Sequence, residues 1–258
     1  MGMVRAARVS LRLLAELLLV SAAGVVLLRV AAGLYAPASR PPGSALASGV
    51  VVAWVVGFLA YGVWSRWRLG AAGPASLGVP NHITAFRGIL FGVVAGFVVV
   101  PPAGYLAWVP AVCYGAGAAI DRLDGLAARR LGSVTELGGR FDQEVDVVGF
   151  AVAAAVAAAW GQLPVWYLLL PALKYVYEGA KYLRRARGRP VYDRPESDAG
   201  RVVAGWQMAF LTAALAPVTD PPRLAVVAPL ALAPSVLVFL RDYLHVSGLL
   251  SGGTETTA

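Results

Sequence analysis

The sequence predicts an all-α protein, namely a polytopic membrane bundle with a six-helix core and two extra N-terminal transmembrane helices. Two observations lead to this prediction. Hydrophobic residues make up 59% of the 258 residues and charged residues only 14%, a far more apolar composition than that of a typical soluble domain. The apolar residues also gather in eight long runs, and a chain that crosses a bilayer is helical because a helix satisfies its own backbone hydrogen bonds.

The eight runs divide the chain into two parts. Two runs, at 13–36 and 47–64, precede a connector that is rich in glycine, alanine and proline, as is typical of a boundary. We therefore expect a two-helix appendage with its connector at 1–72, a six-helix core at 73–246 and a disordered tail at 247–258. The six runs of the core lie at 85–100, 105–120, 147–160, 164–179, 202–218 and 224–240.

The basic residues predict how the chain lies in a membrane. The net charge is +8, and when the N-terminus is placed in the cytoplasm, the opposite side carries only Arg40 and Arg223. Because short cytoplasmic loops are enriched in lysine and arginine, we expect a multi-pass protein of the cytoplasmic membrane with both termini in the cytoplasm. Contact with anionic membrane lipids accounts for the charge. We predict no nucleic-acid partner, because aromatic and basic residues do not alternate as in proteins that stack single-stranded bases.

Four aspartates stand at the facing ends of the fourth and fifth runs. Asp121 and Asp124 are three residues apart, and Asp142 and Asp146 are four apart, so each pair lies on one face of its predicted helix. If these helices fold back on each other, four carboxylates meet at the cytoplasmic face and need divalent cations to offset their repulsion. Oxygen ligands favour Mg²⁺ or Mn²⁺, and two such ions can clamp both oxygens of a phosphoryl displacement.

The spacing of these residues resembles the signature of a known family. Every specified position of the pattern D-x2-D-G-x2-A-R-x8-G-x3-D-x3-D matches residues 121–146, and this pattern is the signature of the CDP-alcohol phosphotransferases, also called CDP-alcohol phosphatidyltransferases. The six later runs are similar to that family's six-helix core. The resemblance implies an enzyme of phospholipid biosynthesis that transfers a phospho-alcohol group from a CDP-linked donor to a second alcohol and releases CMP.

The resemblance also implies a role for each matching residue. Asp121, Asp124 and Asp142 look like metal ligands, and Asp146 looks like both a metal ligand and the general base. The family further implies a CDP-lipid donor such as CDP-diacylglycerol, two Mg²⁺ or Mn²⁺ ions and a homodimer. The residues that would bind CDP are Asn81, Thr84, Gly125, Ala128, Arg129 and Gly138.

The acceptor alcohol has two alternatives within this family. Phosphatidylglycerophosphate synthases often carry G-K-x-K-T-x-x-Q before the fifth core helix, and residues 200–207 keep the glycine, the glutamine and one basic residue. Phosphatidylinositol-phosphate synthases carry an arginine-rich segment that the stretch 184–187 resembles. Both imply a small polar acceptor that carries a phosphate, and its candidate ligands are Arg184, Arg185, Arg187 and Arg201. A divalent-cation transporter is the rival from another class, but it would hold its carboxylates deep within the spans.

Overall fold

The computed structural model describes residues 15–27, 30, 33, 42–68, 78–131, 136–192 and 198–250, without the side chains at 42, 63–68, 123–131 and 136–137. Within these ranges helices joined by turns and loops make up the fold and no strand is formed, which confirms the all-α class. A helix at Ala15–Leu27 comes first. It is followed by α2 (Pro42–Arg68), α3 (Gly78–Gly96), α4 (Val109–Leu131), α5 (Glu136–Ala159), α6 (Leu169–Ala186), α7 (Ala199–Ala214) and α8 (Pro221–Val246). Two short 3₁₀ helices, η2 (Gly104–Trp108) and η3 (Val165–Leu168), lead into α4 and α6.

Each predicted apolar run falls on one of these helices, but several helices continue past the apolar sequence. α4 extends to Leu131, α5 already begins at Glu136, and α6 extends to Ala186. Hydropathy marks only the apolar part of a helix, whereas glutamate, arginine and lysine are also good helix formers. The two aspartate pairs therefore lie within α4 and α5.

The end of the chain departs from the prediction in one respect. The predicted disordered tail begins at 247, but a turn continues the fold to 250, with backbone hydrogen bonds from Leu249 and Leu250 to the carbonyl of Leu244 (3.0 and 3.3 Å). Residues 251–258 lie outside the described part of the chain. The turn forms because Gly248 adopts a positive φ of 74°, which favours glycine.

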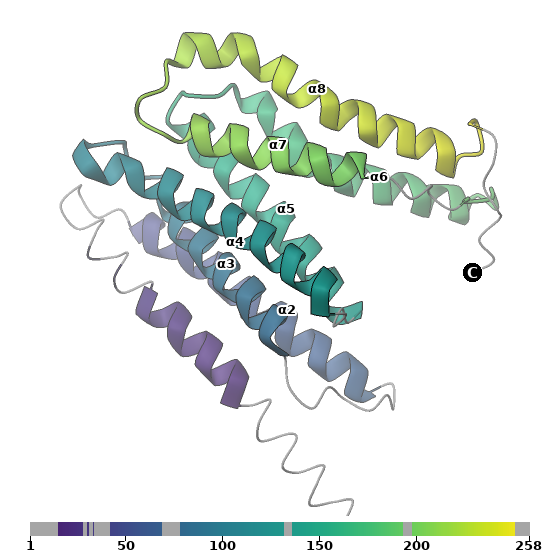
Figure 1. The fold of residues 1–258 in the computed structure, drawn as a ribbon, viewed down its shortest axis with the longest axis horizontal. Coiled ribbons are helices and arrows are strands. Elements are labelled where there is room, and N and C mark those ends of the chain that lie inside the picture. The colour runs from purple at the N-terminus through teal and green to yellow at the C-terminus, as the bar shows by residue number, and fades with distance from the viewer. Residues whose placement is uncertain are drawn as a thin grey trace, which may run out of the picture.

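α5 is the central helix of the core (Figure 1). It contacts α2, α3, α4, α6 and α7. None of the large hydrophobic side chains in its described part is exposed. Ala153, Ala154 and Ala157 are fully buried, as expected where small residues let membrane helices approach closely. The alanine-rich run thus packs inside the bundle.

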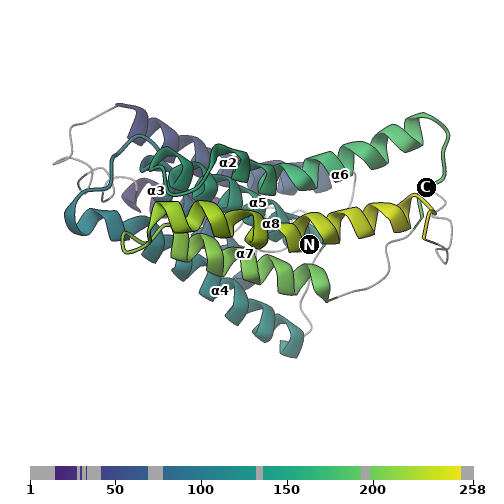
Figure 2. The same cartoon turned by 90° about the horizontal axis from the view of Figure 1, so that it is seen from above.

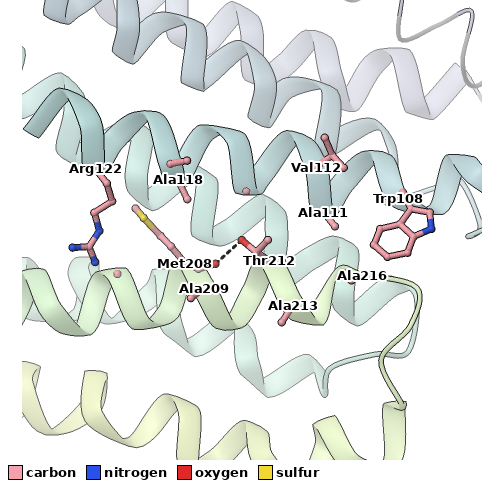
Figure 3. A pocket seen from close by; sticks show the side chains of 13 residues that line it. Trp108, Ala111, Val112, Ala118, Arg122, Met208, Ala209, Thr212, Ala213 and Ala216 are labelled. Carbon is pink, nitrogen blue, oxygen red and sulfur yellow. Dashed lines mark hydrogen bonds between the residues drawn. The ribbon is translucent and has the colours of Figure 1, made fainter.

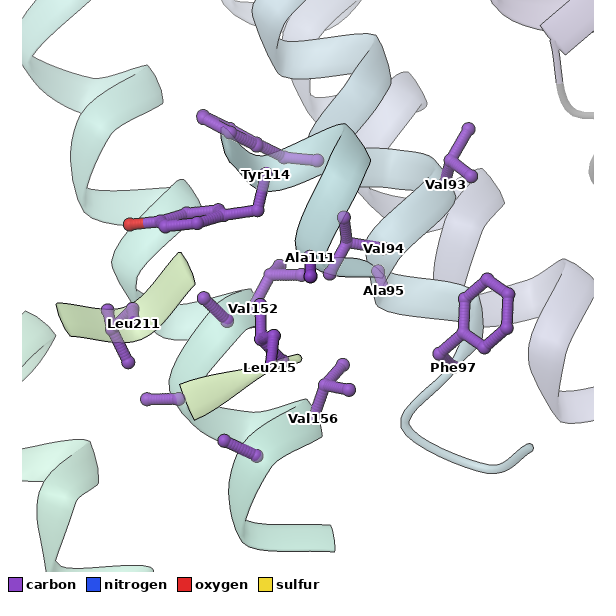
Figure 4. Close-up of a cluster of buried hydrophobic side chains, with 14 of the residues drawn as sticks. Val93, Val94, Ala95, Phe97, Ala111, Tyr114, Val152, Val156, Leu211 and Leu215 are labelled. Atoms are coloured by element: carbon purple, nitrogen blue, oxygen red, sulfur yellow. The ribbon is translucent and has the colours of Figure 1, made fainter. Parts of the chain in front are cut away.

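The aromatic ring of Phe91 fills the space between α3, α4 and α5. A Cβ atom added to Gly117 of α4 or Gly149 of α5 would lie 2.8 or 2.6 Å from a carbon of this ring, closer than van der Waals contact allows. Glycine at both positions therefore admits the ring. Figure 4 shows the surrounding core, in which Tyr114, Val152 and Leu211 come from α4, α5 and α7.

α2 covers the flank of the core at α3. A Cβ atom on Gly88 of α3 would lie 2.5 Å from Val55 of α2, so the two helices are in close contact. Phe58 of α2 also stacks on Phe141 of α5, with 5.5 Å between the ring centroids. The second predicted run is thus packed directly against the core.

The outer surface of the bundle is apolar. By length and composition alone, two of the described helices could cross a membrane, Gly43–Gly62 within α2 and Pro221–Val246, which is α8. Val112 of α4, Val202 of α7 and Leu230 of α8 are 62%, 65% and 72% exposed. An apolar surface on this scale marks contact with a partner or a lipid phase.

The helices place their connections at two opposite ends of the core (Figures 1 and 2). The turns that follow α3, α5 and α7 share one end, where the indole Nε1 of Trp160 donates hydrogen bonds to the carbonyls of Phe97 and Val100 (3.0 and 2.8 Å). The ends of α4, α6 and α8 and the starts of α5 and α7 share the other. Asp121 and Asp142 lie at this second end, together with most of the basic residues.

Candidate active site

Three of the four aspartates meet where α4 and α5 come together. One carboxylate oxygen from each of Asp121, Asp142 and Asp146 lies within 4.8 Å of the others. Their side chains are 24%, 44% and 24% exposed, so solvent reaches the group from one side. Asp124 lies on α4, but its side chain is outside the described part of the chain. The convergence predicted from the helical spacing is observed for the other three.

Arg87 of α3 completes this group, although no role at the site was predicted for it from the sequence. Its side chain is only 1% exposed, and Nη1 lies 2.8 Å from Asp121 Oδ1 and 2.5 Å from Asp142 Oδ1. Nη2 donates a hydrogen bond to Asp146 Oδ1. The signal that points to a site is an arginine inside an apolar run, because such a charge faces protein and a partner.

The position of Arg87 follows from the helical repeat of α3. Asn81, Thr84 and Arg87 are spaced by three residues and share one face of the helix, and all three are at most 5% exposed. The Thr84 hydroxyl donates a hydrogen bond to the carbonyl of Pro80 in the preceding turn (3.1 Å). This polar face of α3 is thus directed into the bundle, toward the carboxylates of α4 and α5.

Burial changes the acidity of one of these carboxylates. The pKa of Asp146 is raised to about 7, chiefly by desolvation. The negative charges of Asp142 and Asp121 also raise this pKa, whereas the positive charge of Arg87 opposes the rise. A carboxyl group with a pKa near neutrality can accept and release a proton under physiological conditions. Asp146 therefore has the acidity expected of a general base.

A cavity of about 590 Å³ opens beside Asp146, between α5, α6, α7 and α8. The Lys174 ammonium pairs with Glu144 at 2.6 Å, and Arg241 pairs with the buried Asp242 at 2.6 Å. The cavity therefore combines cations, among them Lys174 and Arg241 in ion pairs, with carboxylates that include Asp146 of the cluster. The charged and amide side chains in its lining are Gln143, Asp146, Lys174, Glu178, Arg201, Gln207, Arg241 and Asp242.

A buried hydrogen-bond network forms one wall of this cavity. Gln207 Nε2 donates to Ser235 Oγ and to the carbonyl of Ala231, both at 2.8 Å. The Tyr167 hydroxyl donates to Gln207 Oε1 at 2.6 Å. The amide of Gln207 thus ties η3, α7 and α8 together and fixes the shape of the cavity.

The four arginines predicted to bind the acceptor separate into two groups. Arg201 lines the cavity. Arg184 instead donates hydrogen bonds to the carbonyls of Pro190 and Ser247 (3.1 and 3.0 Å) and so joins the ends of α6 and α8, while Arg185 and Arg187 are not among the residues that line the cavity. Lys174 and Arg241 were missed, although a lysine within an apolar run is a signal of the same kind as Arg87.

The predicted CDP-binding residues lie on α3, α4 and α5, the same helices that carry Arg87 and the carboxylates. Thr84 and Asn81 lie about one and two turns before Arg87 on α3. Gly138 lies in the first turn of α5, four residues before Asp142. Gly125, Ala128 and Arg129 continue α4 beyond Asp121, with side chains outside the described part.

A second, apolar cavity lies between α4 and α7 on the outer side of the core (Figure 3). Its volume is about 670 Å³, and Arg122 and Trp108 stand at its two ends (Figure 3). Most of the side chains between them are alanine. The Arg122 guanidinium lies directly over Gly205 of α7, since an added Cβ there would be 1.2 Å from Nη2. We call this cavity the α4/α7 groove.

The comparison with protein families identifies the class of this protein. The family model of the CDP-alcohol phosphatidyltransferases matches residues 77–241, which is more than half of the chain and includes α3 to α7 and most of α8. The chain therefore belongs to the CDP-alcohol phosphatidyltransferase family and is a transferase of substituted phosphate groups. None of the curated proteins with which the sequence was compared matches it.

Proposed function

We propose that this chain is an integral membrane enzyme that transfers a phosphatidyl-type group from a CDP-linked lipid, CDP-diacylglycerol, to a small phosphorylated alcohol and releases CMP. One observation carries the proposal: the carboxylates of Asp121, Asp142 and Asp146 lie within 4.8 Å of one another, and Asp146 also borders a polar cavity that cations from three helices reach. The family supplies the class of reaction. The cavity supports a polar, anionic acceptor.

The acidic residues fit a site for divalent cations. The donor set consists of carboxylate oxygens, which Mg²⁺ and Mn²⁺ prefer, and the space between the oxygens already accommodates the cationic head of Arg87. In our proposal Asp121, Asp124, Asp142 and Asp146 hold two Mg²⁺ or Mn²⁺ ions. Such ions neutralise the charge that develops on the diphosphate during transfer.

Asp146 acts as the general base. Its carboxylate accepts the proton of the acceptor hydroxyl, and the hydroxyl oxygen attacks the lipid-side phosphorus of the donor. A new P–O bond forms to the acceptor while the P–O bond to CMP breaks, and CMP leaves with the electron pair of that bond. Without metal ions the pKa of Asp146 is raised to about 7, and bound divalent cations would favour its ionised form.

The CDP moiety is placed along α3, α4 and α5, at Asn81, Thr84, Gly125, Ala128, Arg129 and Gly138. Asn81 and Thr84 share the polar face of α3 with Arg87, so a nucleotide that contacts them lies next to the carboxylates. Arg129 is proposed to bind the diphosphate, since guanidinium groups match phosphate oxygens.

Lys174, Arg201 and Arg241 are proposed to bind the acceptor phosphate. They reach one cavity from α6, α7 and α8. Val203 and Ala204 line the same cavity at the positions where phosphatidylglycerophosphate synthases often carry lysine and threonine. The cations thus come from other helices, which favours an acceptor other than glycerol phosphate, and phosphatidylinositol-phosphate synthesis is the alternative that we favour.

The α4/α7 groove is proposed to receive a hydrocarbon chain of the donor. A helix rises by about 1.5 Å per residue, so the groove extends roughly 20 Å from Arg122 to Trp108, more than the half-thickness of a bilayer core. Arg122, next to Asp121, lies at the mouth and faces the phosphates. The apolar outer surface supports a multi-pass position in the cytoplasmic membrane, with the carboxylates and both termini at the cytoplasmic side.

The division of the chain belongs to the same proposal. The catalytic core is placed at 73–246, which contains the matched residues 77–241. The two-helix appendage occupies 1–72, and the tail begins after α8. The homodimer expected for this family is tested by cross-linking in membranes.

One assay tests the proposed reaction. Purified protein is incubated with CDP-diacylglycerol, Mg²⁺ or Mn²⁺ and a panel of acceptors that includes inositol phosphate, glycerol phosphate and their unphosphorylated forms, and CMP release is measured. We expect release with a phosphorylated acceptor and with either ion, and none in EDTA. No release with any acceptor from folded protein, together with Mn²⁺ uptake into vesicles that contain it, would instead support the transporter.

A further inference from the structure

The head of Arg87 is directed entirely at the carboxylate cluster. Arg87 is among the largest fully buried side chains of the described structure. Both of its terminal nitrogens contact carboxylates, Nη1 those of Asp121 and Asp142 and Nη2 that of Asp146. Its Nε has no hydrogen-bond partner in the described part of the chain. Among the described residues, the polar contacts of this buried side chain are therefore those with the three carboxylates.

The guanidinium uses the same carboxylates that a divalent cation would use. The three groups within 4.8 Å of one another are the three partners of Arg87. Within the described part of the chain, the single charge of Arg87 contacts all three carboxylates, and a divalent cation would bring further positive charge to them. Each incoming ion, however, competes with Nη1 and Nη2 for oxygen lone pairs and is repelled by a fixed charge a few ångströms away.

We propose that Arg87 is a positioning residue that acts as a built-in competitor of the divalent cations and lowers their affinity in the absence of the donor. The inference rests on the proposed metal site, but not on the identity of the acceptor or of the lipid. A diphosphate adds negative charge to the site and offers oxygens that match a guanidinium. Donor and ions therefore enter together: CDP tightens ion binding, and by thermodynamic reciprocity the ions tighten CDP binding.

A purely structural role for Arg87 predicts the opposite sign. If the arginine only held the carboxylates in place for the ions, its removal would scatter the ligands and weaken ion binding. If it competes with the ions, its removal strengthens their binding while the protein becomes less stable without them. The two roles are thus separated by a binding constant that does not depend on catalysis.

The test uses the full-length protein in detergent after treatment with EDTA, and Mn²⁺ binding is measured by calorimetry. We expect Arg87→Met to lower the Kd for Mn²⁺ by about tenfold or more, since one tenfold step corresponds to only about 1.4 kcal/mol of the repulsion removed. Arg87→Lys keeps the positive charge but has fewer hydrogen-bond donors, so its Kd for Mn²⁺ should lie between those of Arg87→Met and the unaltered protein. Arg223→Met is the control, because Arg223 is 88% exposed and lies at the start of α8, at the opposite end of the bundle.

A second measurement follows thermal unfolding in EDTA, in Mn²⁺ and in Mn²⁺ with CDP. Mn²⁺ should raise the melting temperature of Arg87→Met more than that of the unaltered protein, because ligands stabilise the state that they bind. CDP should tighten Mn²⁺ binding less in this variant than in the unaltered protein. If Arg87→Met folds only in Mn²⁺, the inference is supported. If Arg87→Met does not fold at all, the Mn²⁺ affinity of Arg87→Lys decides between the two roles. An unchanged or weaker Mn²⁺ affinity in the folded variants would overturn the inference, whereas an unaltered protein that binds no Mn²⁺ would overturn the proposed metal site as well.

Discussion

Replacing Lys174 by methionine tests whether the cavity beside Asp146 binds the acceptor. The lysine is 16% exposed and is held by Glu144 at 2.6 Å, so its ammonium group is fixed at the cavity wall. A hydrogen bond to a charged group contributes about 1.5–3 kcal/mol, which corresponds to a roughly 10- to 100-fold rise in the acceptor KM. Stability should change little, because a partly exposed ion pair contributes at most about 1 kcal/mol and methionine retains the apolar stem.

The assay is CMP release with the acceptor concentration varied at saturating donor, followed by the donor concentration varied at saturating acceptor. Arg223→Met is the control, since Arg223 also pairs with a carboxylate, Asp220, at 3.1 Å, but does not line the cavity. We expect the acceptor KM to rise in Lys174→Met alone, with the donor KM unchanged in both variants. Equal acceptor KM values in the two variants would refute the assignment of this cavity to the acceptor.

Four further predictions concern the carboxylates and the helix contacts. Asp146→Asn should abolish turnover while CDP binding, followed by calorimetry, persists; turnover near that of the unaltered protein would contradict the general-base role. In the metal-free protein the pKa of Asp146 is raised to about 7. The metal-free protein should therefore lose stability as the pH rises from about 4 to 7, since the folded state binds the proton more tightly; Asp146→Asn should remove this slope from unfolding curves. Gly149→Ala should destabilise the protein by about 1–3 kcal/mol, because the new methyl group lies 2.6 Å from the buried Phe91 ring. Gly205→Ala should leave the melting temperature unchanged or raise it, since the new methyl group meets the movable head of Arg122. The same change should raise the donor KM. A melting temperature lowered as much as in Gly149→Ala would refute this distinction.

The parts of the site that the sequence predicts are those that depend on one helix at a time. Asp142 and Asp146 share a face because they are four residues apart on α5, and this spacing is local. The meeting of α4 and α5 follows from a short connector between two apolar runs. The boundaries of the helices do not follow, because hydropathy does not mark the charged ends of α4, α5 and α6.

The missed residues depend on how separate helices cross. Arg87 and Lys174 each stand within an apolar run, but the run does not tell whether the side chain meets a headgroup, another helix or a cavity. Arg184 and Arg201 are both basic residues near helix ends, yet the first binds carbonyl groups of the chain itself and the second lines the cavity. Only the packing of α6 and α7 against α8 distinguishes them.

The same packing suits the proposed pair of substrates, a lipid donor and a polar acceptor. α7 is a wall shared by two spaces: Gly205, Met208 and Thr212 line the α4/α7 groove, whereas Arg201 and Gln207 line the polar cavity. Residues on opposite faces of one helix are thus exposed to different environments.

The carboxylate cluster lies where these two spaces end. Asp121 is followed directly by Arg122, which stands at the mouth of the groove, and Asp146 borders the cavity, while Arg87 joins the two aspartates from α3. In the proposed reaction the donor therefore reaches the cluster from the bilayer side of α7 and the acceptor from the other side. The attacking hydroxyl and the phosphorus meet at Asp146, without either substrate having to cross the environment of the other.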